Sequence, residues 1–193
     1  MSFVLASASL RRAELLTSAG FAFTIVPADV DETPIPGERP DDYARRVARA
    51  KAADVLERVA PGTLVLAADT VVVAASGRLM GKPADEADAA SMLRELSGRV
   101  HEVHTAVVLA RGSVDVDALT KTRVRFRELT DGEIAWYLRS GEAFGKAGAY
   151  GIQGRAARFI DWIDGSWSNV VGLPISTVDS LFKLLDGAQG QAD

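Results

Sequence analysis

The chain opens with MSFVLASASLRR (residues 1–12), and this stretch predicts how the fold begins. Its apolar run, Phe3–Ala6, is typical of a buried strand. A helical pattern, Leu10–Ala19, follows directly, with Ser9 as the expected N-cap and Gly20 as the stop. A strand that leads through a short polar turn into a helix is the beginning of an α/β fold.

The same stretch gathers groups that bind anions. Ser7 and Ser9 supply hydroxyls, the start of the helix supplies free N–H groups, and Arg11 and Arg12 supply positive charge. Arginines in the first turn of a helix are otherwise mildly unfavourable, because the helix dipole favours anions there. We interpret the stretch as a candidate phosphate site. A capped surface helix with two solvated arginines is the alternative.

Strand and helix patterns alternate along the rest of the chain, without an internal repeat or a linker. The predicted class is therefore α/β, a mixed sheet with flanking helices, in which any two lobes share the sheet. We expect one domain over residues 1–186 and a polar tail at 187–193. The expected strands lie at residues 21–27, 64–75, 100–110, 114–126 and 159–163, and the expected helices at 41–59, 85–96, 130–139 and 174–185.

Bulk properties narrow the class of protein. The 193 residues are 48% hydrophobic and carry a net charge of −4, which disfavours a nucleic-acid-binding surface. There is no cysteine, as in many proteins of a reducing interior. No stretch resembles a signal peptide, and the longest apolar run, Leu64–Ala75, is too short to span a bilayer. We expect a cytoplasmic protein that binds neither nucleic acid nor membrane.

Three charged residues stand out against this pattern. Asp69 interrupts the apolar run of the central strand, where a buried carboxylate must be paired, protonated or bound to metal. Lys51 falls on the apolar stripe of its helix, between Val47 and Val55. Lys82 lies in a Gly-Lys-Pro turn that we expect to return near Asp69. The structural alternatives are a bond from Asp69 to a nearby hydroxyl such as Thr70, a Lys51 that snorkels outward, and a surface Lys82.

An acidic loop follows the second predicted strand. Asp29, Asp31 and Glu32 lie in it, and carboxylates that cluster with Asp69 would suit Mg²⁺ or Mn²⁺. Solubility of the loop is the alternative explanation. The two histidines, His101 and His104, have no third ligand at metal spacing, so we interpret them as structural.

Taken in order, the motifs of this chain resemble those of the Maf family of nucleoside triphosphate pyrophosphatases, over about residues 3–186. No single motif decides this; their order and spacing do. The resemblance rests on Ser7–Arg12, Asp31–Thr33, Lys51 in Arg-Ala-Lys-Ala, Ala68–Thr70, Gly81–Pro83, Leu96–Gly98, Lys146–Gly154 and Val170–Pro174.

The resemblance implies a fold similar to that of the inosine triphosphatases, elongated, with two lobes around a cleft. It implies hydrolysis of a nucleoside triphosphate to the monophosphate and pyrophosphate, assisted by a divalent cation (Mg²⁺ or Mn²⁺), and a possible homodimer. By this resemblance Ser7, Ser9 and Arg12 bind phosphate, and Lys51 and Lys82 neutralise developing charge. Glu32 and Asp69 hold the metal and position the water, and Asp69 accepts its proton.

The resemblance extends to the choice of substrate. Arg11, Thr70 and Gln153 look like the branch that acts on dTTP and UTP, whereas the branch that acts on 7-methyl-GTP carries tryptophan, glutamine and glutamate there. A tryptophan stacks on a cationic methylated purine. The amide of Gln153 instead offers both a donor and an acceptor to the imide edge of a pyrimidine.

Two other functions compete with this reading. A nucleotide-binding regulator of septum formation would need the phosphate-binding cations but neither acidic residue. A nucleic-acid-binding module is disfavoured by the acidic balance and by the small number of aromatic residues.

Overall fold

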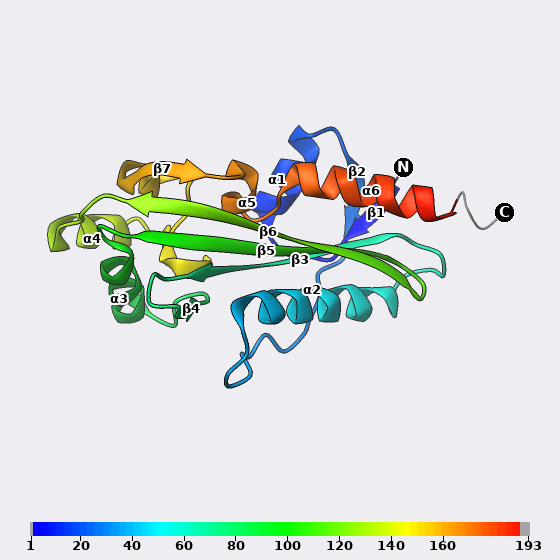
Figure 1. Cartoon of the computed structure of the whole chain (residues 1–193), viewed down its shortest axis with the longest axis horizontal. Helices are drawn as coiled ribbons and strands as arrows, with labels where there is room; N and C mark the ends of the chain where they lie inside the picture. The colour runs from blue at the N-terminus through cyan, green and yellow to red at the C-terminus, as the bar shows by residue number, and fades with distance from the viewer. Residues whose placement is uncertain (1, 190–193) are drawn as a thin grey trace. The chain divides into compact units, whose positions relative to one another are not determined.

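The structure, a computed structural model, describes residues 2–189 and confirms the predicted α/β class (Figure 1). Within these residues a seven-stranded sheet runs in the order β2-β1-β3-β5-β6-β7, and β4 pairs with β3. The sheet is mixed, since β1 is parallel to β2 and β3, whereas β4 and β7 are antiparallel to their neighbours. The strands are β1 (Ser2–Leu5), β2 (Ala22–Ile25), β3 (Val65–Val73), β4 (Leu79–Met80), β5 (Val100–Arg111), β6 (Val114–Phe126) and β7 (Ile160–Asp164).

Helices flank this sheet. They are α1 (Leu10–Ser18), α2 (Pro40–Leu56), α3 (Glu86–Leu96), α4 (Asp131–Leu138), α5 (Trp167–Val171) and α6 (Ile175–Gln189), with short 3₁₀ helices η1 (Ala147–Ala149) and η2 (Arg155–Phe159). All the predicted helices are present, and most of their ends differ from the predicted positions by a few residues. Helix α5 was not predicted, because it is very short and ends in two β-branched valines. Helix α6 continues into the expected polar tail, whose residues 190–193 lie outside the described part.

The helix ends follow ordinary capping chemistry. Helix α2 begins with a proline and carries Asp41 and Asp42 in its first turn, where the helix dipole favours acidic groups. Helix α4 begins with the predicted capping box, in which Thr130 and Glu133 satisfy each other's backbone N–H groups. The expected cap of α1, Ser9, is at the N-cap position but makes no side-chain capping bond.

The chain divides into two compact units that share strands. Among the described residues, unit 1 comprises 2–69, 105–120 and 172–189, and unit 2 comprises 70–104 and 121–171. Strand β3 passes from unit 1 to unit 2 between Asp69 and Thr70, and β5 and β6 likewise contribute residues to both. The prediction that two lobes would share the sheet is therefore confirmed.

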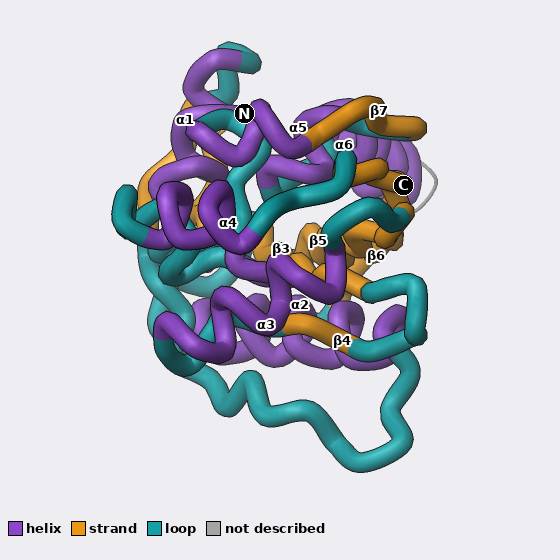
Figure 2. Tube along the Cα trace, turned by 90° about the vertical axis from the view of Figure 1, so that its left-hand side faces the viewer, coloured by secondary structure: helices purple, strands orange, loops and turns teal. Residues whose placement is uncertain are grey.

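Unit 1 is layered around the parallel strands. Helix α2 covers one face, and α1 and α6 cover the other (Figures 1 and 2). Val47 and Val55 of α2 are fully buried, and Phe182 of α6 packs against Phe3 of β1 with ring centroids 5.1 Å apart. Helices α1 and α2, which carry candidate site residues, thus lie on opposite faces of these strands (Figures 1 and 2).

Unit 2 has an aromatic core. Phe126 of β6 contacts the rings of Tyr150 and Phe159 at centroid separations of 4.8 and 6.1 Å, and Tyr137 of α4 contacts Phe159 at 5.4 Å. Leu93 and other apolar residues of α3 belong to the same buried cluster. This core supports the glycine-rich segment that follows α4.

Candidate active site

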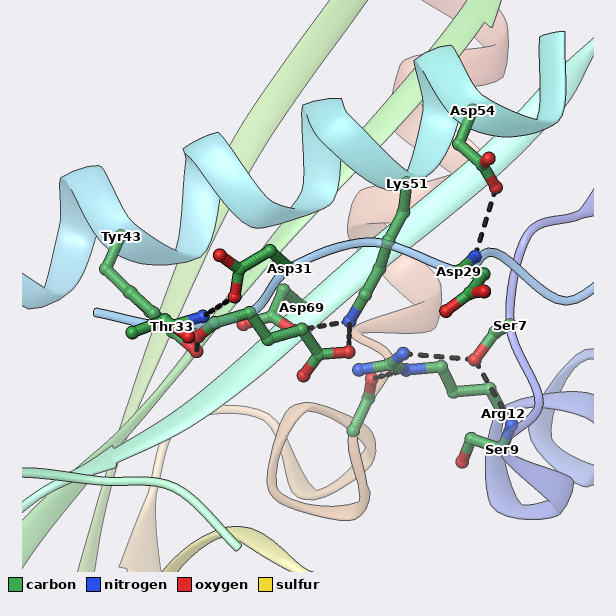
Figure 3. Close-up of polar contacts among 12 residues, drawn as sticks. Ser7, Ser9, Arg12, Asp29, Asp31, Thr33, Tyr43, Lys51, Asp54 and Asp69 are labelled. Atoms are coloured by element: carbon green, nitrogen blue, oxygen red, sulfur yellow. Dashed lines mark hydrogen bonds and ion pairs between the residues drawn. The ribbon is translucent and has the colours of Figure 1, made fainter. Parts of the chain in front are cut away.

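The ends of the parallel strands bring the first site segments of unit 1 together. Leu5 of β1 lies opposite Leu66 of β3, and the chain then leaves β1 for Ser7 while β3 continues to Asp69. Ligand sites of α/β sheets lie at such strand ends, because helix N-termini and the exposed ends of longer strands meet there. In Figure 3, Arg12 of α1 accordingly reaches toward Asp69 from the side of Ser7.

Lys51 joins two carboxylates in unit 1. Its Nζ lies 2.7 Å from Oδ1 of Asp69 and 2.9 Å from Oε1 of Glu32 (Figure 3). Lys51 and Asp69 are only 8% and 5% exposed, whereas Glu32 is half-buried. The ammonium therefore bridges a carboxylate of the core strand and one of the loop before α2.

Arg12 forms the second cationic part of this cluster. Its Nε donates to the carbonyl oxygen of Gly172 at 2.8 Å, and its Nη1 donates to Oγ of Ser7 at 3.1 Å. Oγ of Ser7 also accepts a bond from the backbone N–H of Ser9 at 3.2 Å. Arg12 is 9% exposed, so its guanidinium is held in one orientation by buried partners.

Burial and charge oppose each other at these groups. Burial raises the pKa of the Asp69 carboxyl above its usual 3.8, and the nearby charges of Lys51 and Arg12 oppose that shift. Burial likewise lowers the pKa of the Arg12 guanidinium, and the Asp69 carboxylate opposes it. The four charges of Arg12, Lys51, Glu32 and Asp69 sum to zero, so the cluster is balanced without a ligand.

The remaining predicted site residues belong to unit 2. Thr70 is half-buried on β3, whereas Lys82 and Gln153 are exposed. The chain does turn back along β3, because Met80 of β4 pairs with Val72 of β3 in antiparallel register. The approach of Lys82 and Gln153 to the cluster of unit 1 remains a prediction.

A backbone hydrogen bond from Gly148 joins the segment that leads to Gln153 to the turn that contains Lys82. The N–H of Gly148 donates to the carbonyl of Gly81, next to Lys82, at 3.1 Å. Gly148 has φ of +68°, and a Cβ there would lie 2.9 Å from Cγ2 of Val72. Only glycine fits this position without strain, and the segment that leads to Gln153 is thereby fixed against the turn of Lys82.

A sequence model of the family described as "Maf-like protein" matches residues 2–185. The chain belongs to the Maf family. Its relatives include proteins named "dTTP/UTP pyrophosphatase" from Anaeromyxobacter dehalogenans, 52% identical over 93% of this chain and 92% of that protein, and from Citrifermentans bemidjiense, 49% identical over 98% and 97%. A third with this name, from Myxococcus xanthus, is 49% identical over 93% and 90%.

A solved structure is more distantly similar to this Maf family chain. The dITP/XTP pyrophosphatase of Mycobacterium abscessus is 19% identical and aligns with a TM-score of 0.41, over 74% of this chain and 96% of that one.

The structural alternatives for the buried charges are wrong. Asp69 is paired with Lys51 rather than with a hydroxyl alone, and Lys51 points inward instead of snorkelling to the surface. Lys82 differs from these two, because its side chain is exposed. A lysine in a turn has no periodic neighbours, so the hydrophobic pattern could not distinguish these environments.

The acidic loop contributes less to the cluster than its composition suggested. Of its three acidic residues, Glu32 reaches Lys51, whereas Oδ1 of Asp31 accepts a bond from the N–H of Thr33 at 2.8 Å. The backbone N–H of Asp29 is bonded to Asp54 of α2 at 3.1 Å. Among residues 2–189, no three His, Asp or Glu side chains are placed to hold a metal together.

The two carboxylates that remain do fit a magnesium-type ion. Mg²⁺ is commonly held by one or two carboxylates, with water and substrate phosphates completing its shell. Glu32 and Asp69 each use one oxygen toward Lys51 in the contacts above, and each has a second oxygen. The donor set is therefore suited to a cation that arrives with a nucleotide, not to a site built of protein ligands alone.

Sequence reasoning missed two residues of this Maf family site. Gly172 contributes only its backbone carbonyl, and every residue type has such a group, so its role cannot be recognised from the residue type. Tyr43 donates its hydroxyl to the backbone carbonyl of Glu32 at 2.8 Å. Its place at the start of the buried face of α2, beside Ala44, suits a core residue equally well.

No helix in the described part of the chain is long and apolar enough to cross a membrane.

Proposed function

We propose that this chain is a nucleoside triphosphate pyrophosphatase that converts dTTP and UTP to the monophosphate and pyrophosphate. The observation that carries the proposal is the buried bridge from Lys51 to Asp69 and Glu32, beside the guanidinium of Arg12. Buried charges are costly to a fold, so such a cluster is expected where a charged substrate uses it. The name shared by relatives at about half identity supports this reaction.

The reaction assigns a role to each charged group. Water attacks the α-phosphorus, its proton passes to Asp69, and the bond to the leaving pyrophosphate oxygen breaks. Arg12 and Lys51, with Lys82, stabilise the charge on the phosphate oxygens, and the hydroxyls of Ser7 and Ser9 help to bind them. Because burial raises the pKa of Asp69, its carboxylate is a stronger base than an exposed aspartate.

A divalent cation fits the charge balance of the site. The cluster is neutral, so a triphosphate would add uncompensated negative charge to a buried region. We infer that Glu32 and Asp69 hold Mg²⁺ or Mn²⁺ when the nucleotide binds. The ion would supply Lewis-acid stabilisation of a phosphate oxygen.

The test is a panel of nucleotides with Mg²⁺ or Mn²⁺, in which monophosphate and pyrophosphate are both measured. We expect dTTP and UTP to be the best substrates, with pyrophosphate and not orthophosphate as product. Better turnover of 7-methyl-GTP would contradict the specificity. Nucleotide binding without any turnover would favour the non-catalytic regulator.

A specificity swap tests which residues select the nucleobase of the substrate. We propose that Arg11, Thr70 and Gln153 select the pyrimidine, and the triple variant Arg11→Trp, Thr70→Gln and Gln153→Glu tests this directly. We expect the ratio of kcat/KM for UTP over 7-methyl-GTP to fall by about tenfold or more, because a pocket contact is worth roughly 1–3 kcal/mol. A matched control, Arg139→Trp on the exposed end of α4, should leave the ratio unchanged.

Two further expectations accompany this function. We propose that the protein is cytoplasmic, where nucleotide pools occur, and that it forms a homodimer. Light scattering of the purified protein tests the second point, since a monomer at working concentration would contradict it.

A further inference from the structure

The loop that carries Glu32 is attached to helix α2 at several points. Residues 26–39 connect β2 to α2 without regular secondary structure. Near its start, the carbonyl of Pro27 accepts a bond from Arg58 at 2.8 Å, and the N–H of Asp29 donates to Asp54 at 3.1 Å. Both partners lie at the far end of α2 or just beyond it. The loop is therefore fastened to the helix that also carries Lys51.

The central attachment is made by Tyr43. Its hydroxyl donates to the backbone carbonyl of Glu32 at 2.8 Å, and its side chain is 5% exposed. Burial raises the pKa of this hydroxyl to about 12, so it remains a donor at neutral pH. Figure 3 shows Tyr43 reaching from α2 to the loop, on the same helix as Lys51.

Arg46 supports the same attachment from the next turn of α2. Its Nη2 donates to the carbonyl of Thr33 at 3.2 Å, and its guanidinium makes two bonds to Glu38 at 2.6 and 2.8 Å. The guanidinium also lies 5.4 Å from the centre of the Tyr43 ring. The backbone on both sides of the Glu32 carbonyl is thus held by α2.

Glu32 depends on this attachment for its place in the cluster. Its side chain is 38% exposed, whereas Asp69 is held within a buried strand. A half-exposed side chain on an irregular loop retains conformational freedom unless its backbone is fixed. Holding a reacting group in place contributes to the rate rather than to binding alone.

We propose that Tyr43 is a positioning residue that acts through Glu32. Its hydroxyl fixes the backbone carbonyl of Glu32. The carboxylate of Glu32 is thereby kept in one position against Lys51, beside Asp69. The proposal rests on the proposed pyrophosphatase function for its kinetic consequence, but not for its structural one.

A double-mutant cycle tests the kinetic consequence. We expect Tyr43→Phe to lower kcat on UTP about tenfold, with KM changed less than threefold. In the Glu32→Gln background the same substitution should change kcat by less than twofold, because the group it positions is already lost. Equal losses in the two backgrounds would overturn the proposal.

Tyr150→Phe is the matched control. Tyr150 is also 5% exposed, and its hydroxyl is also bonded at 2.8 Å, but to His101 in unit 2. Any effect of Tyr150→Phe on kcat should be the same with glutamate or glutamine at position 32. This arm separates loss of a buried tyrosine hydroxyl in general from loss of the bond to Glu32.

Hydrogen exchange tests the structural consequence without any substrate. In Tyr43→Phe, the amides of the non-proline residues among 29–36 should exchange at least fivefold faster, while those of β1 remain unchanged. Unchanged exchange in the loop would overturn the proposal even in an active enzyme. If the wild type hydrolyses no nucleotide, the proposed function fails, and the exchange arm still decides whether Tyr43 holds the loop.

Discussion

The two units bury polar groups of different kinds. In unit 1 the buried polar side chains include three that carry charge: Arg12, Lys51 and Asp69. In unit 2 the buried polar residues are His101, His104, Thr122 and Asn169, none of them a lysine, arginine, aspartate or glutamate, and burial lowers the pKa of His101 to about 4.

Three of these groups bond to one another, to Tyr150 or to the backbone. Nε2 of His101 lies 2.8 Å from the hydroxyl of Tyr150, and Nδ2 of Asn169 donates to the carbonyl of Val103 at 2.9 Å and to Thr122 at 3.0 Å. Such bonds contribute to stability once made. The charges of unit 1 face a desolvation cost that their mutual attraction often fails to repay. The contrast agrees with the proposal that unit 1 retains its charges for a ligand, whereas unit 2 retains its polar groups for the fold.

Asp69→Asn should produce the largest effect. We expect kcat on UTP to fall roughly 10³–10⁴-fold, because the proton acceptor is lost, while the Kd for the nucleotide changes little. Steady-state kinetics and calorimetric binding in Mg²⁺ provide the two measurements. A variant that retains a tenth of the wild-type kcat would show that the buried carboxylate of unit 1 is structural after all.

Lys51→Met should destabilise the fold by about 3–5 kcal/mol, because it leaves Asp69 and Glu32 without their shared cation. The loss should be smaller at pH 5 than at pH 8, since the orphaned Asp69 carboxyl has a raised pKa and is relieved by taking up a proton. Denaturant unfolding at both pH values measures this. Lys183→Met is the control, because that lysine is exposed on α6; equal losses for both variants would contradict the prediction.

His101 should make the stability of unit 2 depend on pH in the opposite direction, so that stability falls as the pH is lowered. Its folded pKa of about 4 lies below the ordinary 6.5, so the unfolded chain binds the proton first as pH falls. Stability contributed by neutral His101 is therefore complete above pH 6.5 and is lost toward pH 4, by up to about 3 kcal/mol. The difference in unfolding free energy between pH 7 and pH 4.5 should shrink in His101→Leu; an unchanged difference would exclude this histidine as the source.

Thr122→Val should have the smallest of these effects. It removes a hydroxyl that accepts bonds from Asn169 and from the N–H of Ser166, both at 3.0 Å, at nearly constant volume. We expect a loss of about 2 kcal/mol in unfolding free energy, with kcat within twofold of wild type. Thr120→Val on the same strand is the control, since that hydroxyl is half-buried beside Thr177. A large loss of kcat in Thr122→Val would contradict the view that the buried polar groups of unit 2 serve the fold rather than the reaction.

Much of the fold was predictable from local patterns. Alternation and apolar runs located the long strands, and caps and glycine stops located the helices, including the capping box at Thr130. The short elements were not predictable in the same way: β4 has two residues and α5 has five, too few for a period to be recognised. Their presence depends on pairing with β3 and on packing in unit 2.

The candidate site was predictable only in part. Asp69 and Lys51 violate the hydrophobic pattern, and that violation marked them as functional candidates before any contact was known. Glu32 came from the motif resemblance, because an acidic loop has no periodicity that separates one carboxylate from its neighbours. Gly172 lies in the Val170–Pro174 motif but had no assigned role, since it acts through its backbone, and Tyr43 gave no signal because it resembles a core residue.

The amino-acid sequence by itself determined the class of fold, the Maf family and the presence of charge inside the core, because these depend on local pattern and on the order of motifs. Only the tertiary structure decided which charges meet: Lys51 with both Asp69 and Glu32, and Arg12 with Ser7 and Gly172. The physical reason is that partners far apart in the chain are selected by strand register and helix packing, which no local stretch encodes.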